Sequence, residues 1–166
     1  MQMLLNFELL PLDGGQEIRT RSYADVASGV HIAIDQNRGE IGILPGEELT
    51  ISLTEISPET EWAEFAIDLC DARWMECSRL VLRLEARCDG AQSLIHPALR
   101  IYEEGRFFDC FASEKLTLAK ERSSKRVVFD LSPKDFAQAK ALSLFLFFEC
   151  VDEKLYISNL SISGLA

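Results

Sequence analysis

The feature that most constrains the fold is an alternation of apolar and polar residues with a period of two, which recurs along the chain. In residues 79–88, RLVLRLEARC, one face carries only apolar or small side chains: Leu80, Leu82, Leu84, Ala86 and Cys88. This alternation is typical of a β-strand with one buried and one exposed face, because successive side chains point to opposite sides. The same pattern predicts strands at 29–35, 48–53, 64–69 and 126–131.

Two further segments indicate where strands lie within the sheets. Residues 142–150, LSLFLFFEC, are apolar on both faces, which predicts a central strand covered on each side. Residues 153–166, EKLYISNLSISGLA, alternate almost to their end. A terminus stays ordered only where something pairs with it. We therefore expect LYISNLSI to close a sheet beside the early segment MLLNFEL.

Helical signals are few. Residues 132–141 carry Ser132 at a plausible N-cap and Pro133 at the first helical position, so one short helix is predicted near 133–140. A second helical turn is expected over 71–77. Many short strands with a single late helix predict an all-β fold, an antiparallel β-sandwich of the jelly-roll type. The length of 166 residues suits a single domain over 1–166.

Charge narrows the range of partners. The chain has 17 Lys and Arg against 27 Asp and Glu, a formal net charge of −10. Such a surface repels phosphate groups, so neither nucleic acid nor an anionic membrane is an expected partner. No apolar run is long enough for a bilayer span, and the first residues lack the basic start of a secretory signal. A cytoplasmic location is expected, with export after removal of a signal as the alternative.

The five cysteines agree with that location. Their number is odd and no CxxC pair occurs, so the spacing of a zinc ribbon is absent. Cys88 and Cys150 fall in phase with the apolar face of their strands, which predicts buried, reduced thiols. A disulfide in an exported protein remains the alternative.

Three segments resemble a known family. LLNFEL, VVFDLSPKDFAQAKALSLFLFF and LYISNLSI resemble, in order, the opening strand, the strand–helix–strand unit and the closing strand of the galactose-binding-like jelly rolls, which include many carbohydrate-binding modules. The resemblance implies a jelly-roll fold that binds a glycan and has no catalytic cofactor.

The resemblance also raises the question of a structural calcium ion, which such modules often bind with help from an Asp in the closing strand. Here Ser158 and Asn159 occupy that place. Asp13 and Asn159 are the candidate metal ligands, with Glu8 and Asp152 as further oxygen donors, because calcium prefers several oxygen ligands including carboxylates. A sandwich without metal is the alternative.

No set of residues predicts an enzyme. His31 and His96 occur without a Gly-x-Ser-x-Gly elbow. Glu103, Glu104 and Asp109 in YEEGRFFD offer carboxylates for glycoside hydrolysis, but the Glu-Glu-Gly run is typical of a hairpin turn with solvated acids. A non-catalytic protein is therefore predicted.

Aromatic residues on polar strand faces point to a binding surface instead. In EWAEFAIDL, Trp62, Glu64 and Asp68 face away from the apolar side of the strand. A Trp beside carboxylates suits a sugar, because the ring stacks on the pyranose and the acids accept hydroxyl hydrogen bonds. Tyr102 is likewise out of phase with its apolar neighbours. The predicted ligand-binding residues are Trp62, Glu64, Asp68, Tyr102, Arg79 and Arg83, where the arginines bind carboxylates of an acidic sugar or of a partner.

The sequence therefore predicts a non-catalytic carbohydrate-binding β-sandwich with a glycan partner. The alternative is a cytoplasmic module for protein interaction or self-association, such as a homodimer, that uses the same sheet face.

Overall fold

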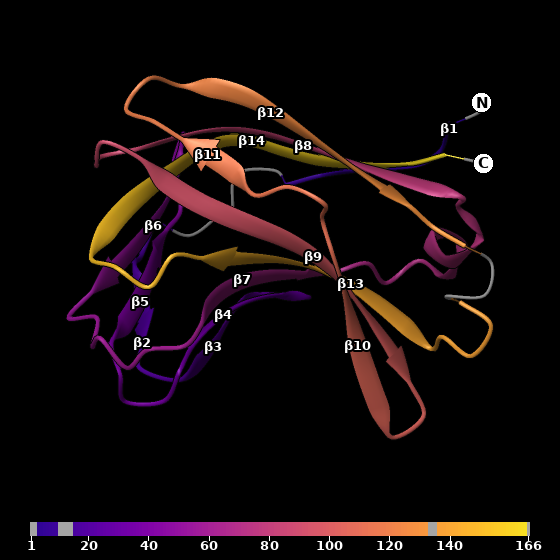
Figure 1. Cartoon of the computed structure of the whole chain (residues 1–166), viewed down its shortest axis with the longest axis horizontal. Coiled ribbons are helices and arrows are strands. Elements are labelled where there is room, and N and C mark those ends of the chain that lie inside the picture. Colours follow the sequence, from indigo (N-terminus) through magenta and orange to yellow (C-terminus); the bar gives the residue numbers. More distant parts are fainter. Residues whose placement is uncertain (1–2, 10–14, 133–135, 166) are drawn as a thin grey trace.

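The computed structural model describes residues 3–9, 15–132 and 136–165, and in these residues two antiparallel sheets pack face to face (Figure 1). Each sheet has seven strands within the described residues. Inward-facing side chains of both sheets form one shared apolar core, as in other β-sandwiches. The prediction of an all-β antiparallel sandwich is confirmed.

The first sheet contains the two ends of the described chain. β14 pairs with β1 in addition to its two neighbours in the main strand order. In spatial order the strands are β12 (Ser123–Asp130), β8 (Arg79–Cys88), β14 (Glu153–Leu165), β6 (Leu49–Thr54), β5 (Glu40–Leu44) and β2 (Ile18–Thr20), with β1 (Met3–Glu8) beside β14.

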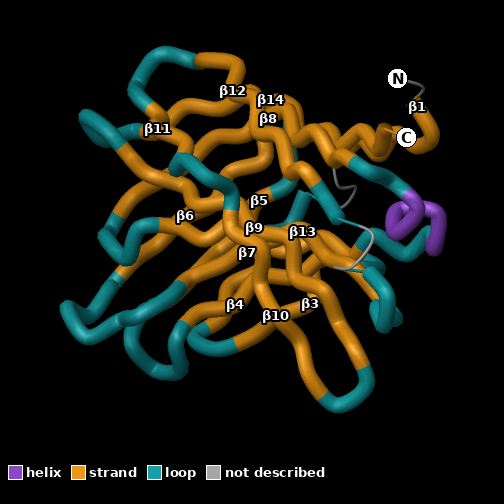
Figure 2. Tube along the Cα trace, turned by 45° about the vertical axis from the view of Figure 1, so that its right-hand side comes forward, coloured by secondary structure: helices purple, strands orange, loops and turns teal. Residues whose placement is uncertain are grey.

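The second sheet contains β13, the strand predicted to be covered on both faces. In spatial order the strands are β10 (Arg106–Phe111), β9 (Ser93–Glu103), β13 (Ala141–Phe148), β7 (Ala63–Asp68), β4 (Val30–Ile34) and β3 (Tyr23–Ala27), with β11 (Leu116–Leu118) beside β9. The β9–β10 hairpin extends beyond the body of the sandwich (Figures 1 and 2).

β14 stays ordered because it is paired along both edges, as the sequence predicts. One edge pairs with β8 from Leu155 to Leu165, with an irregularity between Ile157 and Asn159. The other edge pairs with β6 as far as Ile157 and then with β1 from Ser161 to Leu165. The early and late strands therefore close the first sheet together.

The helical content differs from the expectation in one respect. Of the helix predicted near 133–140, residues 133–135 lie outside the described residues, and Phe136–Gln138 form a turn rather than a helix. The Lys140 N–H donates to the Tyr102 carbonyl at 2.7 Å, which places the chain in β-pairing before a second helical turn can form. The turn expected over 71–77 is present as the short 3₁₀ helix η1 (Ala72–Glu76), and no described helix is long and apolar enough to cross a bilayer.

Burial keeps several cysteine thiols protonated. Cys77 and Cys88 are buried and Cys150 is half-buried, and desolvation raises the pKa of all three thiols. A protonated, buried thiol packs as a small apolar group and reacts slowly. No disulfide joins any two cysteines in the described part of the chain.

The end of β14 packs closely against η1 and the residue that follows it. Gly164 pairs with Leu80, and a Cβ atom at Gly164 would lie 2.5 Å from the Cys77 sulfur and 3.2 Å from the Trp74 ring. Trp74 is itself buried. The strand can approach η1 this closely only because residue 164 has no side chain.

We expect Gly164→Ala to lower the free energy of unfolding by about 1–3 kcal/mol, because the added methyl group forces apart a packed core. Urea denaturation followed by circular dichroism measures the change. Gly90→Ala is the matched control: no atom outside its chain neighbours lies within 3.8 Å of the added Cβ, so stability should hold or rise by about 0.4–1 kcal/mol. Equal losses at both positions would contradict this packing.

Candidate functional site

The outward face of the second sheet is the candidate site. Ala66 on β7 and Ala98 on β9 flank Phe145 on β13, and the three form a small apolar cluster separate from the main core, with Phe147 packed against it. Phe145 is only 1% exposed although it points away from the core. The small side chains on both sides let the Phe145 ring lie close to the sheet. We call the rings of Phe145 and Phe147 on this face the aromatic floor.

Aromatic rings continue from this floor toward the sheet edge. The rings of Phe145 and Phe147 stack with centroids 5.7 Å apart, and Phe147 meets Phe111 of β10 at 5.6 Å. Phe111 also packs on His96, at 4.6 Å. Phe111 itself is 50% exposed, and a row of rings that ends in solvent is typical of a surface that binds a ligand or a partner.

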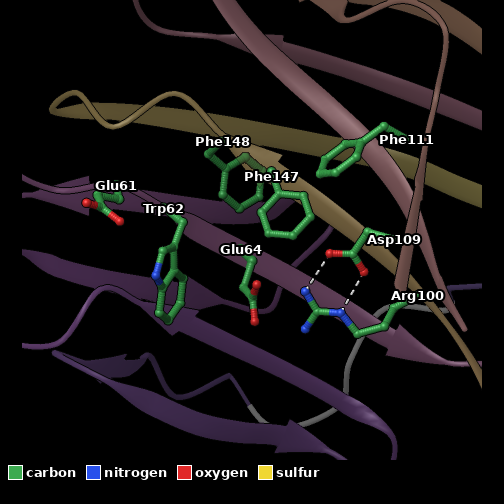
Figure 3. Close-up of a pocket in the computed structure, with 8 residues that line it drawn as sticks. All are labelled: Glu61, Trp62, Glu64, Arg100, Asp109, Phe111, Phe147 and Phe148. Carbon is green, nitrogen blue, oxygen red and sulfur yellow. Dashed lines mark hydrogen bonds and ion pairs between the residues drawn. The ribbon is translucent and has the colours of Figure 1, made fainter. Parts of the chain in front are cut away.

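A hollow of about 480 Å³ opens beside these rings (Figure 3). Trp62, which immediately precedes β7 and is 37% exposed, stands on one side, and Arg100 with Asp109 stands on the other. Glu64 lies between them on the floor (Figure 3). The full lining is Glu61, Trp62, Glu64, Arg100, Asp109, Phe111, Phe147 and Phe148.

Arg100 is held rigidly by the β9–β10 hairpin. The hairpin register places Arg100 directly opposite Asp109, whose Oδ1 and Oδ2 accept hydrogen bonds from Nε at 2.7 Å and Nη2 at 2.9 Å. The guanidinium carbon also lies 4.1 Å from the centre of the Phe145 ring and 4.3 Å from that of Phe107. A bidentate pair combined with stacking leaves the charge of Arg100 neutralised and its plane fixed.

Glu64 is a buried carboxyl in the centre of this face. It is 8% exposed, and burial raises its pKa to about 7, against the opposing effect of Arg100. The nearest ring nitrogen is Nε2 of His31, at 3.9 Å from Oε1. Burial lowers the pKa of His31, so that imidazole is mostly neutral at pH 7 and supplies no permanent counter-charge.

A second hollow, of about 400 Å³, lies on the same face beyond Phe145. It is lined by Tyr23, His31, Asp68, Tyr102 and Ser143, among others. The Ser143 hydroxyl donates to Oδ1 of Asp68 at 2.7 Å. The Tyr23 hydroxyl donates to Asp25 at 2.6 Å, and this bond raises the pKa of Tyr23 to about 12. The second hollow therefore offers hydroxyl and carboxylate groups around aromatic rings.

The structure brings together four of the six predicted ligand-binding residues. Trp62 and Glu64 line the first hollow, and Asp68 and Tyr102 line the second, on one sheet face. Alternation along single strands was enough to place these four on the outward side.

Arg79 and Arg83 do not join them, which corrects the prediction of one shared site. Both lie on β8 in the other sheet, where Nε of Arg79 donates to Oδ1 of Asp130 at 2.6 Å. Alternation shows which residues share a strand face, but it does not show which sheet the strand joins.

The sequence did not point to Arg100, His31 or Tyr23 as binding residues, and Asp109 was considered only as a carboxylate for glycoside hydrolysis. Counting outward from the predicted hairpin turn pairs Arg100 with Asp109, as the structure does. That count would have shown a cation and an anion directly opposite each other on the polar face. Tyr23 and His31 had no such local signal, because they reach the site only through the pairing of β3 with β4 and of β4 with β7.

The calcium site considered from the sequence stays a prediction, because one of its two candidate ligands lies outside the described residues. Asp13 lies outside the described residues, and the Asp152 carboxylate accepts a hydrogen bond from the Ile56 N–H at 2.8 Å. Asn159 is exposed, and it lines an open hollow together with Glu8 and Arg83. Within the described part of the chain, no three acidic, His or Cys side chains converge as metal ligands would.

Solved structures share this fold. The CBM22-1 xylan-binding domain from Paenibacillus barcinonensis Xyn10C has a TM-score of 0.55 at 10% identity, covering 99% of this chain and 96% of that domain. The family 11 carbohydrate-binding module from Clostridium thermocellum, in complex with a β-1,3-1,4-mixed-linked tetrasaccharide, has a TM-score of 0.54 at 12% identity over 96% of each chain. CBM29_1, a family 29 module from Piromyces equi, has a TM-score of 0.51 at 10% identity over 90% of each chain.

At these identities the likeness establishes the fold, which is the jelly roll of carbohydrate-binding modules. The predicted resemblance in fold to carbohydrate-binding-module jelly rolls is thereby confirmed. No protein-family model and no curated protein sequence matches the chain.

The raised pKa of Glu64 predicts a pH-dependent stability. The folded state holds the Glu64 proton with a pKa of about 7, against an ordinary value of 4.5, so its contribution to stability is complete below pH 4.5 and is lost as the pH rises through 7. Glu64→Gln should therefore gain stability relative to the wild type over this window, by up to about 3 kcal/mol. Urea denaturation at a series of pH values measures the difference. Glu121→Gln, at an exposed position, should run parallel to the wild type.

The stacked ion pair of Arg100 predicts that lysine cannot replace it. Arg100→Lys keeps the charge but loses one of two hydrogen bonds and the stacking plane, so we expect the free energy of unfolding to fall by about 1–3 kcal/mol. Arg106→Lys, in the same hairpin with a side chain that is 70% exposed, should change it by less than about 1 kcal/mol. Thermal denaturation of both variants makes the comparison, and an equal effect would show that the stacked pair adds nothing.

Proposed function

We propose that this protein is a non-catalytic module that binds a glycan on the outward face of the second sheet. The observation that carries the proposal is the combination, in one hollow, of an exposed indole and buried polar groups over an aromatic floor. Sugars present flat C–H faces and radial hydroxyl groups, so they require rings to stack on and fixed acceptors and donors beside them. Trp62 supplies the ring, and Glu64 and Asp68 supply acceptors.

The extent of the face supports an oligosaccharide rather than a single sugar. The two hollows lie on either side of Phe145 and share one sheet surface, from Trp62 and Phe111 to Tyr23 and Tyr102. The similar structures are named for xylan binding or were solved with a tetrasaccharide, which supports the proposal by analogy of fold.

The proposed absence of catalysis follows from the state of the carboxylates. Glycoside hydrolysis requires two carboxyl groups free to donate, accept or attack. Glu64 and Asp109 line the same hollow, but both oxygens of Asp109 accept hydrogen bonds from Arg100. With both of its oxygens occupied by Arg100, Asp109 is not free to attack or to activate water, so the two carboxyl groups do not form a hydrolytic pair.

Self-association through the same face is the alternative function. Phe107 and Phe111 are 56% and 50% exposed, and a phenyl ring has no polar edge to favour contact with water. Exposed apolar rings on an otherwise polar surface often mark a protein interface. A homodimer would cover these rings directly.

Tryptophan fluorescence tests the proposal, because the two Trp residues lie in different surroundings. Trp62 is 37% exposed at the hollow, whereas Trp74 is 4% exposed in the core beside Gly164. After a glycan array identifies a ligand, that oligosaccharide should change the emission of the wild type and of Trp74→Phe. Trp62→Ala should lose the response and at least 10-fold in affinity, while its stability stays within about 1 kcal/mol.

The alternative predicts a different set of results. If the protein self-associates, sizing chromatography should show a dimer that Phe107→Ser with Phe111→Ser converts to a monomer, with no response to any oligosaccharide. A loss of several kcal/mol of stability in Trp62→Ala would show that Trp62 is a packing residue, and the glycan proposal would then fail.

A further inference from the structure

Resting on the proposed function, we propose that the glycan carries positive charge: the hollow between Trp62 and Arg100 selects an amino sugar, whose ammonium group binds the Glu64 carboxylate. The proposal specifies the chemical class of the ligand, a glycan with free glucosamine-type amino groups.

Glu64 carries the inference because it is buried without a hydrogen-bond donor or a permanent cation of its own among the described residues. The residue is 92% hidden, since it is 8% exposed, yet its carboxylate makes no hydrogen bond among the described residues and points into the hollow (Figure 3). A carboxylate taken out of water is costly unless a cation or a donor meets it. Its raised pKa is the sign of that missing partner.

The two basic groups near Glu64 cannot supply the missing charge. Arg100 is committed to Asp109 through two hydrogen bonds. His31 lies 3.9 Å away, but burial lowers its pKa and leaves it mostly neutral at pH 7. An ammonium group brought by a ligand would meet a carboxyl group that lacks a permanently charged partner of its own, and would favour the ionised form of that group.

The net charge of the residues that line the two hollows is negative, which also favours a cationic ligand. Among the described residues that line them, the one Arg is neutralised by Asp109, which leaves Glu61, Glu64 and Asp68 as acids without a basic partner. Such a surface attracts cations and repels sugars that carry carboxylates. The arginines that suggested an acidic sugar, Arg79 and Arg83, lie on the other sheet.

Trp62 adds a second reason for a cation. Its ring stands next to Glu64 in the hollow (Figure 3). An indole attracts a cation near its face more strongly than other aromatic rings do. An amino sugar offers both a C–H face that can stack on Trp62 and an ammonium group that can pair with the Glu64 carboxylate. A neutral sugar provides only the first of these contacts.

The test compares glycans that differ only at the amino group. Wild-type protein is titrated at low salt with the fully deacetylated β-1,4-glucosamine hexamer, with its N-acetylated counterpart and with the β-1,4-glucose hexamer. We expect the glucosamine hexamer to bind about 10-fold more tightly than either of the others. The preference should shrink as salt is added, because salt screens the attraction between a cationic glycan and the acidic residues around the hollow.

Two variants locate the effect. Glu64→Gln keeps the shape and removes the charge, so it should reduce the preference for the glucosamine hexamer over the glucose hexamer to less than about 3-fold, whatever its effect on the affinity for the glucose hexamer. Glu85→Gln is the control: it removes the same charge from β8 on the other sheet and should leave all affinities unchanged.

Four other outcomes would contradict the inference, and each would contradict a different part of it. Equal or tighter binding of the neutral hexamers by the wild type, or of an oligogalacturonate, would leave glycan binding intact and refute the charged ligand. An equal loss of affinity for every hexamer in Glu64→Gln would make Glu64 an acceptor for hydroxyl groups only. A lysine hexapeptide that binds as tightly as the glucosamine hexamer would refute the sugar assignment. Failure of all glycans to bind would refute the proposed function as well.

Discussion

The structure depends on a single strand that is buried on both faces. β13 contributes Leu142, Leu144 and Leu146 to the core between the sheets, and Phe145 to the aromatic floor outside it. Such a strand cannot exchange its two faces without placing the phenyl rings among the leucines, so its register is strongly specified. Since the floor is the back of a core strand, the candidate site is held as firmly as the core itself.

The sequence predicted the parts of the structure that arise within one strand or between adjacent ones. The alternation in 79–88 gave the inward leucines of β8, and the paired ends in β1 and β14 followed from the ordered final segment. Trp62 and Asp68 could be placed on an outward face for the same reason. The helix predicted near 133–140 is replaced by a turn over its described part, Phe136–Gln138. The cause is a long-range backbone hydrogen bond from Lys140 to Tyr102, which the local capping residues could not predict.

What the sequence could not predict is how the strands divide between two sheets. Arg79 and Arg83 lie on the polar face of β8, and Trp62 lies on the polar side of the segment that leads into β7. The two strands belong to different sheets, so the arginines and Trp62 are on opposite sides of the sandwich. This division changes the charge at the site: without those arginines, Glu61 and Glu64 are acids that Arg100, already paired with Asp109, does not balance. The proposed preference for a cationic over an anionic ligand therefore depends on how the strands divide between the sheets, and no pattern within one strand contains that division.

The pairing of β1 with the end of β14 makes the described chain nearly circular. Met3 and Leu165 are partners in the first sheet, whereas the aromatic floor lies on the far side of the second sheet. Both ends can therefore be anchored to a solid support, or to another protein, with the floor still facing solution. A short peptide joining the two ends, with a new opening at the exposed Lys120–Glu121 bend, would give a circular permutant in which no strand of either sheet is cut.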